Sequence, residues 1–253
     1  MKSVADAHTE QRSLKGCRVL VTGGTTGIGR AIAVLLASEG AKVFICGRAA
    51  THLEDALARI RELGEGAGVT VDLAQRDQLA SLFEASDRFL GGLDIAIINA
   101  AVPAEAVGDT EEEDLRAQIE TDFTAYLVTA KKAAERMHEG GDIVLIGSMA
   151  AVSRKGGNSI YVAAKSGVEG FAKSLREELA EKDIKVGLIE PGFTGADFQY
   201  PEYPPEKQRQ LIEEQRMLRA EDIAAAAHFM LTQPRRTAVS LMRVETRRKH
   251  PEG

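Results

Sequence analysis

The chain has 253 residues, of which 44% are apolar and 28% charged, so it has the size and balance of a globular protein with a substantial core. Its formal net charge of −6 disfavours a nucleic-acid surface, which is usually basic. Residues 1–13 lack the apolar centre of a signal peptide, and no apolar run of roughly 18 residues could span a membrane, so a cytoplasmic location is expected.

The cysteines and the one basic stretch exclude further classes of site. Cys17 and Cys46 are too few for a disulfide framework and have no metal-ligand spacing, so both are expected to be inert core thiols and no metal site is predicted. The basic stretch at 235–250 is interpreted as a solvated tail, with a phosphate-binding arm as the alternative.

Short apolar runs and longer amphipathic runs alternate along the chain. Seven runs have the length and β-branched content of strands, at residues 17–23, 41–47, 68–72, 93–101, 142–148, 184–192 and 238–244. Helical periodicity marks the runs at 28–40, 51–64, 78–92, 110–141, 159–182 and 221–233. The proline-containing stretch between the sixth strand and the last helix is expected to be irregular.

The predicted strands are apolar on both faces and are separated by helices, which indicates right-handed crossovers and a parallel sheet covered on both sides. The predicted fold class is therefore α/β, a doubly wound parallel sheet of about seven strands with helices on both faces. No linker or repeat divides the chain, so a single domain is predicted. Ligands of such sheets bind at the carboxyl ends of the strands, where all the motifs below lie.

A glycine-rich segment, TGGTTGIG at residues 22–29, follows the first predicted strand. Its spacing is not G-x-G-x-x-G, but Gly23 can take backbone angles that other residues avoid, Gly27 lets the chain approach a pyrophosphate, and Gly29 permits close helix–strand packing. The helix that begins near Ile28 offers free N–H groups to phosphates. The segment therefore predicts a phosphate-binding turn, with a purely structural turn as the alternative. No Gly-Lys-Ser/Thr follows, which disfavours an ATP-type loop.

The end of the second predicted strand indicates which dinucleotide such a turn would bind. An acid there would accept hydrogen bonds from a ribose diol and repel a 2′-phosphate. This chain has Cys46, Gly47 and Arg48 instead, and an arginine suits a phosphate. NADP(H) is therefore favoured over NAD(H); the alternative is that Arg48 is a surface residue that opens a helix.

Two further strand ends carry candidate residues with two interpretations each. Asp72 would bond an exocyclic adenine amine, or simply cap the next helix. Asn99, Ala100 and Ala101 are small enough to let a nucleotide lie against the backbone, whereas the amide of Asn99 could instead tie two strands together. These alternatives stay open at the level of the sequence.

Ser148 ends the fifth predicted strand, and Tyr161 and Lys165 follow on one predicted helix, where the i and i+4 positions face the same way. A nearby ammonium favours the phenolate, as would an oxidised nicotinamide, so Tyr161 could exchange a proton with a substrate hydroxyl or carbonyl. Ser148 could hydrogen-bond the same substrate oxygen while hydride moves at carbon. A tyrosine and a lysine one turn apart are common in helices, so the pair has weight only together with the glycine turn and the serine.

These motifs, in this order and spacing, resemble the short-chain dehydrogenase/reductase family over residues 16–245. The resemblance implies a single Rossmann-like NAD(P)-binding catalytic domain over that range, between an N-terminal extension at 1–15, expected to be flexible, and a basic tail at 246–253. It also implies reversible alcohol–carbonyl redox with Tyr161 as acid and base. Members of the family commonly form dimers or tetramers, often through the helices that correspond here to 110–138 and 159–181.

The resemblance implies a set of cofactor-binding positions. They are Gly23, Thr25, Gly27, Ile28, Gly29, Arg48, Asp72, Leu73, Asn99, Ala100, Ala101, Tyr161, Lys165, Pro191, Gly192 and Thr194. Lys165 would hold the nicotinamide ribose, and Pro191-Gly192 would lead a loop over the nicotinamide into a substrate lid at 193–217. In the lid, aromatic side chains would wall a pocket or pack on one another, and residues 149–155 would form the opposite wall; these aromatic residues are Phe193, Phe198, Tyr200 and Tyr203.

The chain departs from the family pattern in three places. Asp122 stands where relatives have an asparagine that positions a water on the proton path to Lys165, and a carboxylate there would stabilise the charged lysine and weaken its effect on Tyr161. A threonine that often follows the Pro-Gly pair is Ala196 here, with Thr194 as a substitute. The ending at 238–249 lacks an Asp-Gly-Gly and is more similar to NADP-dependent 3-hydroxy acid dehydrogenases.

The expected function is NADP(H)-dependent interconversion of a secondary alcohol and a ketone, with β-hydroxy and β-keto acid derivatives as one candidate class of substrate. The alternative is a catalytically impaired dinucleotide-binding regulatory or scaffold protein of the same fold, which only Asp122 favours. A sugar-nucleotide epimerase is disfavoured, because such relatives are longer and space their glycines differently.

Overall fold

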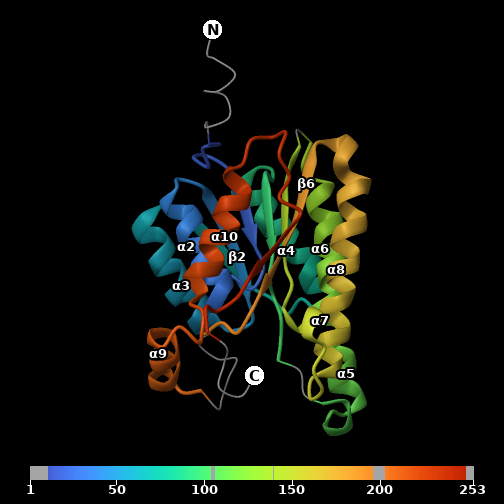
Figure 1. Ribbon diagram of the computed structural model, residues 1–253. Helices are drawn as coiled ribbons and strands as arrows, with labels where there is room; N and C mark the ends of the chain where they lie inside the picture. Colours follow the sequence, from blue (N-terminus) through green and yellow to red (C-terminus); the bar gives the residue numbers. More distant parts are fainter. Residues whose placement is uncertain (1–10, 104–105, 139, 196–202, 249–253) are drawn as a thin grey trace.

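Seven parallel strands form one sheet in the computed structural model, which describes residues 11–103, 106–138, 140–195 and 203–248 (Figure 1). Their order in space is β3-β2-β1-β4-β5-β6-β7. The strands are β1 (Arg18–Val21), β2 (Lys42–Gly47), β3 (Glu65–Thr70), β4 (Ile95–Ile98), β5 (Gly141–Ile146), β6 (Ile184–Pro191) and β7 (Leu241–Val244). The predicted doubly wound parallel sheet is confirmed, although β3 and β5 begin before the predicted runs.

Helices cover both faces of this sheet (Figure 1). One face carries α2 (Gly27–Ser38), α3 (Ala50–Leu63) and α10 (Ala220–Thr232), and the other carries α4 (Arg76–Leu90), α6 (Ala125–Ala134) and α8 (Ser159–Leu179). Each face encloses its own cluster of buried apolar side chains. Because helices cover both faces, the strands bury apolar side chains on both sides. Each fully buried large apolar side chain stabilises the fold by roughly 1.5–3 kcal/mol relative to an exposed one.

Shorter elements gather at the carboxyl ends of the strands, the lower end of Figure 1. They are α5 (Glu112–Ile119), α7 (Ala150–Ser153), α9 (Pro205–Glu213) and a three-ten turn at Val107–Asp109. A second three-ten turn, Ala180–Lys182, precedes β6 at the opposite end of the sheet. The run expected as one helix at 110–141 is instead α5 and α6 joined by a π-helical turn, Glu120–Thr124, and it ends at Ala134. Single π turns of this kind often occur at functional sites.

Helix α9 corrects the expectation that the stretch before the last helix is irregular. Pro204 precedes the helix in an extended conformation, and Pro205 opens it. At the first helical position the N–H that proline lacks has no partner within the helix, so proline there starts a helix without breaking it. Leu211 is buried and anchors α9 to the domain.

Residues 11–15 pack on the domain, ahead of the expected boundary at residue 16. Leu14 is buried, and the backbone N–H of Arg12 donates to the carbonyl of Thr232 at 2.9 Å. The guanidinium of Arg12 also binds the buried carboxylate of Asp142. The expected flexible extension at 1–15 therefore contains an anchored part, while residues 1–10 lie outside the described residues.

The two thiols differ in burial. Cys46 is buried, which raises its pKa to about 12, so it stays a neutral thiol as expected. Cys17 is only partly buried, so the expectation of a core thiol is wrong for it, although burial still raises its pKa. Among the described helices, none combines the length and apolar character that a membrane span requires.

Candidate active site

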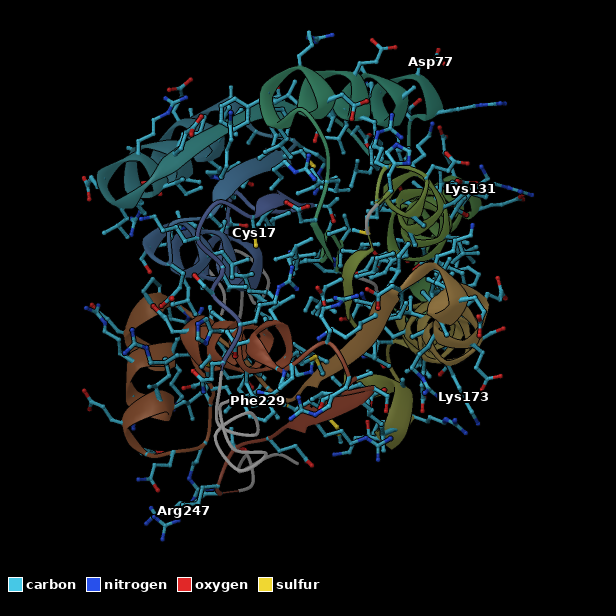
Figure 2. All side chains as sticks on the ribbon, turned by 90° about the horizontal axis from the view of Figure 1, so that it is seen from above. Cys17, Asp77, Lys131, Lys173, Phe229 and Arg247 are labelled. Atoms are coloured by element: carbon cyan, nitrogen blue, oxygen red, sulfur yellow. The ribbon has the colours of Figure 1, made fainter. Side chains whose placement is uncertain are left out.

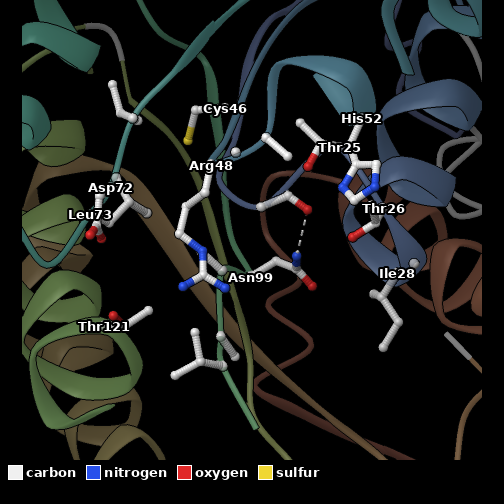
Figure 3. A pocket seen from close by; sticks show the side chains of 18 of the residues that line it. Thr25, Thr26, Ile28, Cys46, Arg48, His52, Asp72, Leu73, Asn99 and Thr121 are labelled. Carbon is white, nitrogen blue, oxygen red and sulfur yellow. Dashed lines mark hydrogen bonds between the residues drawn. The ribbon is translucent and has the colours of Figure 1, made fainter. Parts of the chain in front are cut away.

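A cavity of about 570 Å³ opens at the carboxyl ends of β1, β2, β3 and β4, where the strand order reverses between β1 and β4 (Figure 3). This is the switch point at which open α/β sheets bind ligands. Ten of the predicted cofactor-binding residues line it: Gly23, Thr25, Gly27, Ile28, Arg48, Asp72, Leu73, Asn99, Ala100 and Ala101. The other predicted positions are not among its lining residues: Gly29, Tyr161, Lys165, Pro191, Gly192 and Thr194.

The glycine turn has a backbone that only glycines suit. Gly23 and Gly27 have φ of +63° and +51°, in the left-handed region. A Cβ at Gly29 would lie 2.2 Å from the carbonyl oxygen of Gly23 and 2.5 Å from Nδ2 of Asn99, so no side chain fits there. Helix α2 begins at Gly27, and its first residues line the cavity, so the positive end of the helix lies at the cavity wall.

Asn99 ties the end of β4 to this turn. Its Nδ2 donates to the carbonyl oxygen of Gly23 at 3.2 Å (Figure 3). The same Nδ2 donates to the carbonyl oxygen of Thr22 at 3.2 Å, and the backbone N–H of Asn99 donates to Oγ1 of Thr22 at 2.9 Å. The amide of Asn99 therefore ties the ends of β4 and β1 together, which was one of its two interpretations. The backbone of Ala100 and Ala101 still faces the cavity.

Arg48 is exposed and follows directly after β2, and its side chain extends into the cavity towards Asn99 (Figure 3). The lining includes one carboxylate, Asp72, from the end of β3. Oδ1 of Asp72 accepts a hydrogen bond from the N–H of Ala74 at 3.0 Å, and its own N–H donates to Oε1 of Gln78 at 2.7 Å. Asp72 therefore shapes the turn before α4 and also lines the cavity, although its side chain does not cap α4, whose N-cap residue is Gln75.

Sequence reasoning missed several residues of the cavity wall. Among them, Thr26 and His52 lie on the side of α2 and α3, and Thr121 belongs to the π-helical turn (Figure 3). Val102, which follows the end of β4, also lines the cavity. Thr26, His52 and Val102 adjoin a predicted strand end or helix start, whereas Thr121 lies within the run that was predicted as one helix.

Tyr161 and Lys165 lie one turn apart on α8, as predicted. Nζ of Lys165 is 5.6 Å from the centroid of the Tyr161 ring. Ser148 follows β5, and its Oγ accepts a hydrogen bond from the N–H of Ala150 at 3.1 Å, at the start of α7. That contact uses an acceptor position of the hydroxyl and leaves its O–H available as a donor.

Lys165 is buried, with 1% of its surface exposed. Its Nζ donates to the hydroxyl of Tyr126 at 2.9 Å and to the carbonyl oxygen of Ile146 at 3.2 Å. Burial lowers the pKa of Lys165 to about 8, and the carboxylate of Asp122 opposes this. Sequence reasoning missed Tyr126, although its position four residues after Asp122 on one helical run places the two on the same face.

Asp122 lies in the π-helical turn and is buried. Its Oδ1 accepts a hydrogen bond from the N–H of Val102 at 2.8 Å, and its buried Oδ2 has no hydrogen-bond partner within the described part of the chain. Burial raises the pKa of this carboxyl to about 6, while Lys165, the Val102 N–H and Arg48 act to lower it.

The loop after β6 is fixed near the start of α7. The N–H of Met149 donates to the carbonyl of Pro191 at 2.9 Å, and Oγ1 of the buried Thr194 donates to the carbonyl of Gly192 at 3.0 Å. Phe193 and Tyr203 pack edge to face, with ring centroids 5.2 Å apart, so these two aromatic residues of the expected lid pack on each other. Residues 196–202, including the predicted Ala196, Phe198 and Tyr200, lie outside the described residues.

Known proteins are similar to this chain in sequence and in fold. Residues 18–207 match the sequence profile of a family described as short chain dehydrogenase. Carbonyl reductase family member 4 of Xenopus laevis is 31% identical over 217 residues, which cover 85% of this chain and 90% of that protein. A 3-oxoacyl-[acyl-carrier-protein] reductase of Homo sapiens is 33% identical over 181 residues, 70% of this chain and 75% of that protein. The crystal structure of a short chain dehydrogenase from Burkholderia cenocepacia in complex with NADP matches with a TM-score of 0.82 and 30% identity, over 92% of this chain and 98% of that one.

Proposed function

The chain belongs to the short-chain dehydrogenase/reductase family, and we propose that it is an NADP(H)-dependent oxidoreductase that interconverts a secondary alcohol and a ketone by hydride transfer. The observation that carries this proposal is the buried Lys165 ammonium, 5.6 Å from the Tyr161 ring. A free phenol, with a reference pKa near 10, is a weak base at neutral pH. A neighbouring positive charge favours its ionised form and makes Tyr161 suitable for proton exchange.

The backbone that lines the cavity suits a bound dinucleotide. The absence of side chains at Gly23, Gly27 and Gly29 lets the turn approach a pyrophosphate, and the first turn of α2 supplies N–H groups to it. The adenine end would lie against Asp72 and Leu73. The nicotinamide end would lie towards the group formed by Tyr161, Lys165, Pro191, Gly192 and Thr194. When bound, the nicotinamide would supply the hydride chemistry, which side chains do not provide.

Arg48 supports NADP(H) as the cofactor. Its guanidinium lies in the cavity at the end of β2, where NAD-specific relatives of this fold place an acid against the ribose diol. A guanidinium can bind a 2′-phosphate through two parallel hydrogen bonds. The NADP complex of the Burkholderia cenocepacia relative, at 30% identity, supports the same choice.

The proton steps follow from Tyr161 and Ser148. In the oxidation, the Tyr161 phenolate accepts the proton of the substrate hydroxyl as hydride leaves the carbon; in the reduction, the Tyr161 phenol donates a proton to the carbonyl oxygen. The O–H of Ser148, whose oxygen already accepts from Ala150, donates to the same substrate oxygen. Lys165 supplies the positive charge that favours the phenolate and also binds the nicotinamide ribose.

The relatives support a carbonyl substrate. Two of them are named as a carbonyl reductase and as a 3-oxoacyl-[acyl-carrier-protein] reductase, so β-keto acid derivatives are the first class to test. The second candidate function, a dinucleotide-binding protein with impaired catalysis, is favoured by Asp122, because its buried carboxylate partly offsets the charge of Lys165.

A two-step experiment separates the two functions. NADPH and NADH are first titrated by their fluorescence change, and then a panel of ketones, β-keto acid derivatives and secondary alcohols is screened by absorbance with both cofactor pairs. The proposed function predicts tight NADPH binding and turnover of at least one carbonyl compound. Tight binding without turnover of any compound supports the second function, and absence of binding rejects both.

A homodimer or homotetramer is part of the proposal. The helical runs that the family uses for association correspond here to α5, α6 and α8, and Figure 2 shows Lys131 of α6 and Lys173 of α8 on the same outer side of the molecule. Light scattering at several protein concentrations measures the assembly, and a mass equal to one chain at all concentrations contradicts it.

A further inference from the structure

Tyr126 on α6 lies against the Lys165 ammonium from inside the domain. Its side chain is 1% exposed, its hydroxyl accepts the hydrogen bond from Nζ of Lys165 at 2.9 Å, and it donates to the carbonyl oxygen of Ile146 at 3.0 Å. Nζ of Lys165 also lies 4.4 Å from the centroid of the Tyr126 ring. The same phenol thus contacts the ammonium through both its oxygen and its ring face.

These contacts offset the burial of a charge. An ammonium that loses its water needs acceptors inside the protein, or it loses its proton. Lys165 has three N–H donors, of which one goes to Tyr126 and one to the carbonyl of Ile146 on β5. One N–H is left for a partner outside this inner group. An aromatic face adds further attraction for a desolvated cation.

The other charged and titratable groups around Lys165 come from two elements. Asp122, from the π-helical turn, favours its charged form, and Tyr161, from α8, lies 5.6 Å away by its ring centroid. Burial raises the pKa of Tyr126 well above its ordinary value, and Asp122 and Tyr161 raise it further. Tyr126 therefore stays neutral, so its oxygen can accept from Lys165 while its proton bonds Ile146.

We propose that Tyr126 is a positioning residue for Lys165, which holds the ammonium in place and in its charged form through the hydroxyl contact and the ring face. The inference rests on the proposed function only in giving Lys165 its role beside Tyr161. Without the hydroxyl, the buried ammonium loses an acceptor, and the carbonyl of Ile146 loses its phenolic donor. Lys165 then releases its proton at lower pH, and its charge no longer supports Tyr161 over the same pH range.

Tyr126→Phe is the direct test, because it keeps the ring and removes the hydroxyl. The protein is labelled with ¹⁵Nζ-lysine, the Lys165 resonance is assigned by its loss in Lys165→Met, and its titration is followed by NMR. The proposal predicts that the midpoint of Lys165 falls by about one pH unit in Tyr126→Phe. Tyr203→Phe, which removes a phenol oxygen before α9, is the matched control and leaves the midpoint unchanged. An unchanged midpoint in Tyr126→Phe overturns the proposal.

A second measurement uses the unaltered protein and covers the case in which Tyr126→Phe does not fold. With ¹³Cζ-tyrosine, the Tyr126 resonance is expected to shift with the same midpoint as the Lys165 amine, because its oxygen accepts a hydrogen bond from Nζ of Lys165. A Tyr126 resonance that does not respond to the Lys165 titration overturns the proposal. Neither titration needs substrate or turnover, so a failed activity screen and a failed positioning role are told apart.

Discussion

One hydrogen bond of 2.8 Å, from the backbone N–H of Val102 to Oδ1 of Asp122, joins the wall of the cavity to the surroundings of Lys165. Val102 lines the cavity, whereas Asp122 acts on the charge of the buried Lys165. Because Oδ2 of Asp122 has no partner within the described residues, the ionised carboxylate is held by this bond and by nearby positive charge. A change at Asp122 should therefore affect both the proton chemistry and the cavity wall.

Asp122→Asn removes the charge and keeps the size of the side chain. The carboxylate favours the charged Lys165 but places a negative charge near Tyr161, which disfavours the phenolate. We expect the unaltered enzyme to have a pH optimum about one pH unit above that of the variant, or a lower turnover. The pH dependence of kcat measures this once a substrate is known. Superimposable profiles contradict the prediction.

The fold and the cavity follow from local signals in the sequence. The apolar runs predicted the strands, and the glycines of 22–29 predicted a turn whose positive φ values the structure contains. Arg48 and Asp72 were found because parallel strands bring their carboxyl ends to one edge. The contact between Tyr126 and Lys165 could not be predicted in this way, because it depends on how α6 and α8 pack. A tyrosine within an apolar helix face is equally suited to filling a core.

Arg48→Ala should change the choice of cofactor. If the guanidinium binds the 2′-phosphate, its loss weakens NADPH binding by roughly 10–100-fold, since a charge-assisted hydrogen bond is worth about 1.5–3 kcal/mol. NADH has no 2′-phosphate, so its affinity should stay the same. Fluorescence titration of both cofactors measures the ratio. Arg88→Ala, at an exposed arginine in the last turn of α4, is the control. Equal loss for NADPH and NADH contradicts the assignment.

Tyr161→Phe should stop turnover and spare cofactor binding. The substitution removes the proposed acid and base, a role that typically contributes 10²–10⁴-fold to the rate, so kcat should fall by about that factor. The ring remains beside Lys165, so the affinity for NADPH should change little. Rate assays on the best substrate and a fluorescence titration together measure this. Retention of more than about a tenth of kcat would mean that another group moves the proton.

Gly29→Ala should disrupt the cavity from within. The new Cβ would lie 2.2 Å from the carbonyl oxygen of Gly23 and 2.5 Å from Nδ2 of Asn99, so the turn must move. We expect a loss of roughly 1–3 kcal/mol in the free energy of unfolding and weaker binding of both cofactors. Gly170→Ala on α8 is the matched control, because its Cβ would meet no atom within 4 Å. That variant should gain up to about 1 kcal/mol from helix propensity. Equal Tm and cofactor affinity for both variants contradict the role of Gly29.

Asp122 should also make the stability of the fold depend on pH. Burial raises its pKa from 3.8 to about 6, so the native protein holds this proton more tightly than the unfolded chain. The resulting stabilisation is fully present below the unfolded pKa of 3.8 and is lost as the pH rises through about 6. Asp122→Asn has no titrating carboxyl at this position and so has no such loss. The free energy of unfolding of the variant minus that of the unaltered protein should therefore rise by roughly 2–3 kcal/mol between about pH 4 and pH 7.

Urea unfolding of both proteins at several pH values across this window measures the difference. In the unaltered protein the titration of Lys165 does not produce the same effect, because its pKa of about 8 lies above the window. Asp114→Asn, at an exposed aspartate in the first turn of α5, controls for the loss of a negative charge at the surface. If the stability difference for Asp122→Asn is the same at every pH, the carboxyl has the same pKa in the folded and the unfolded protein, which contradicts the raised pKa.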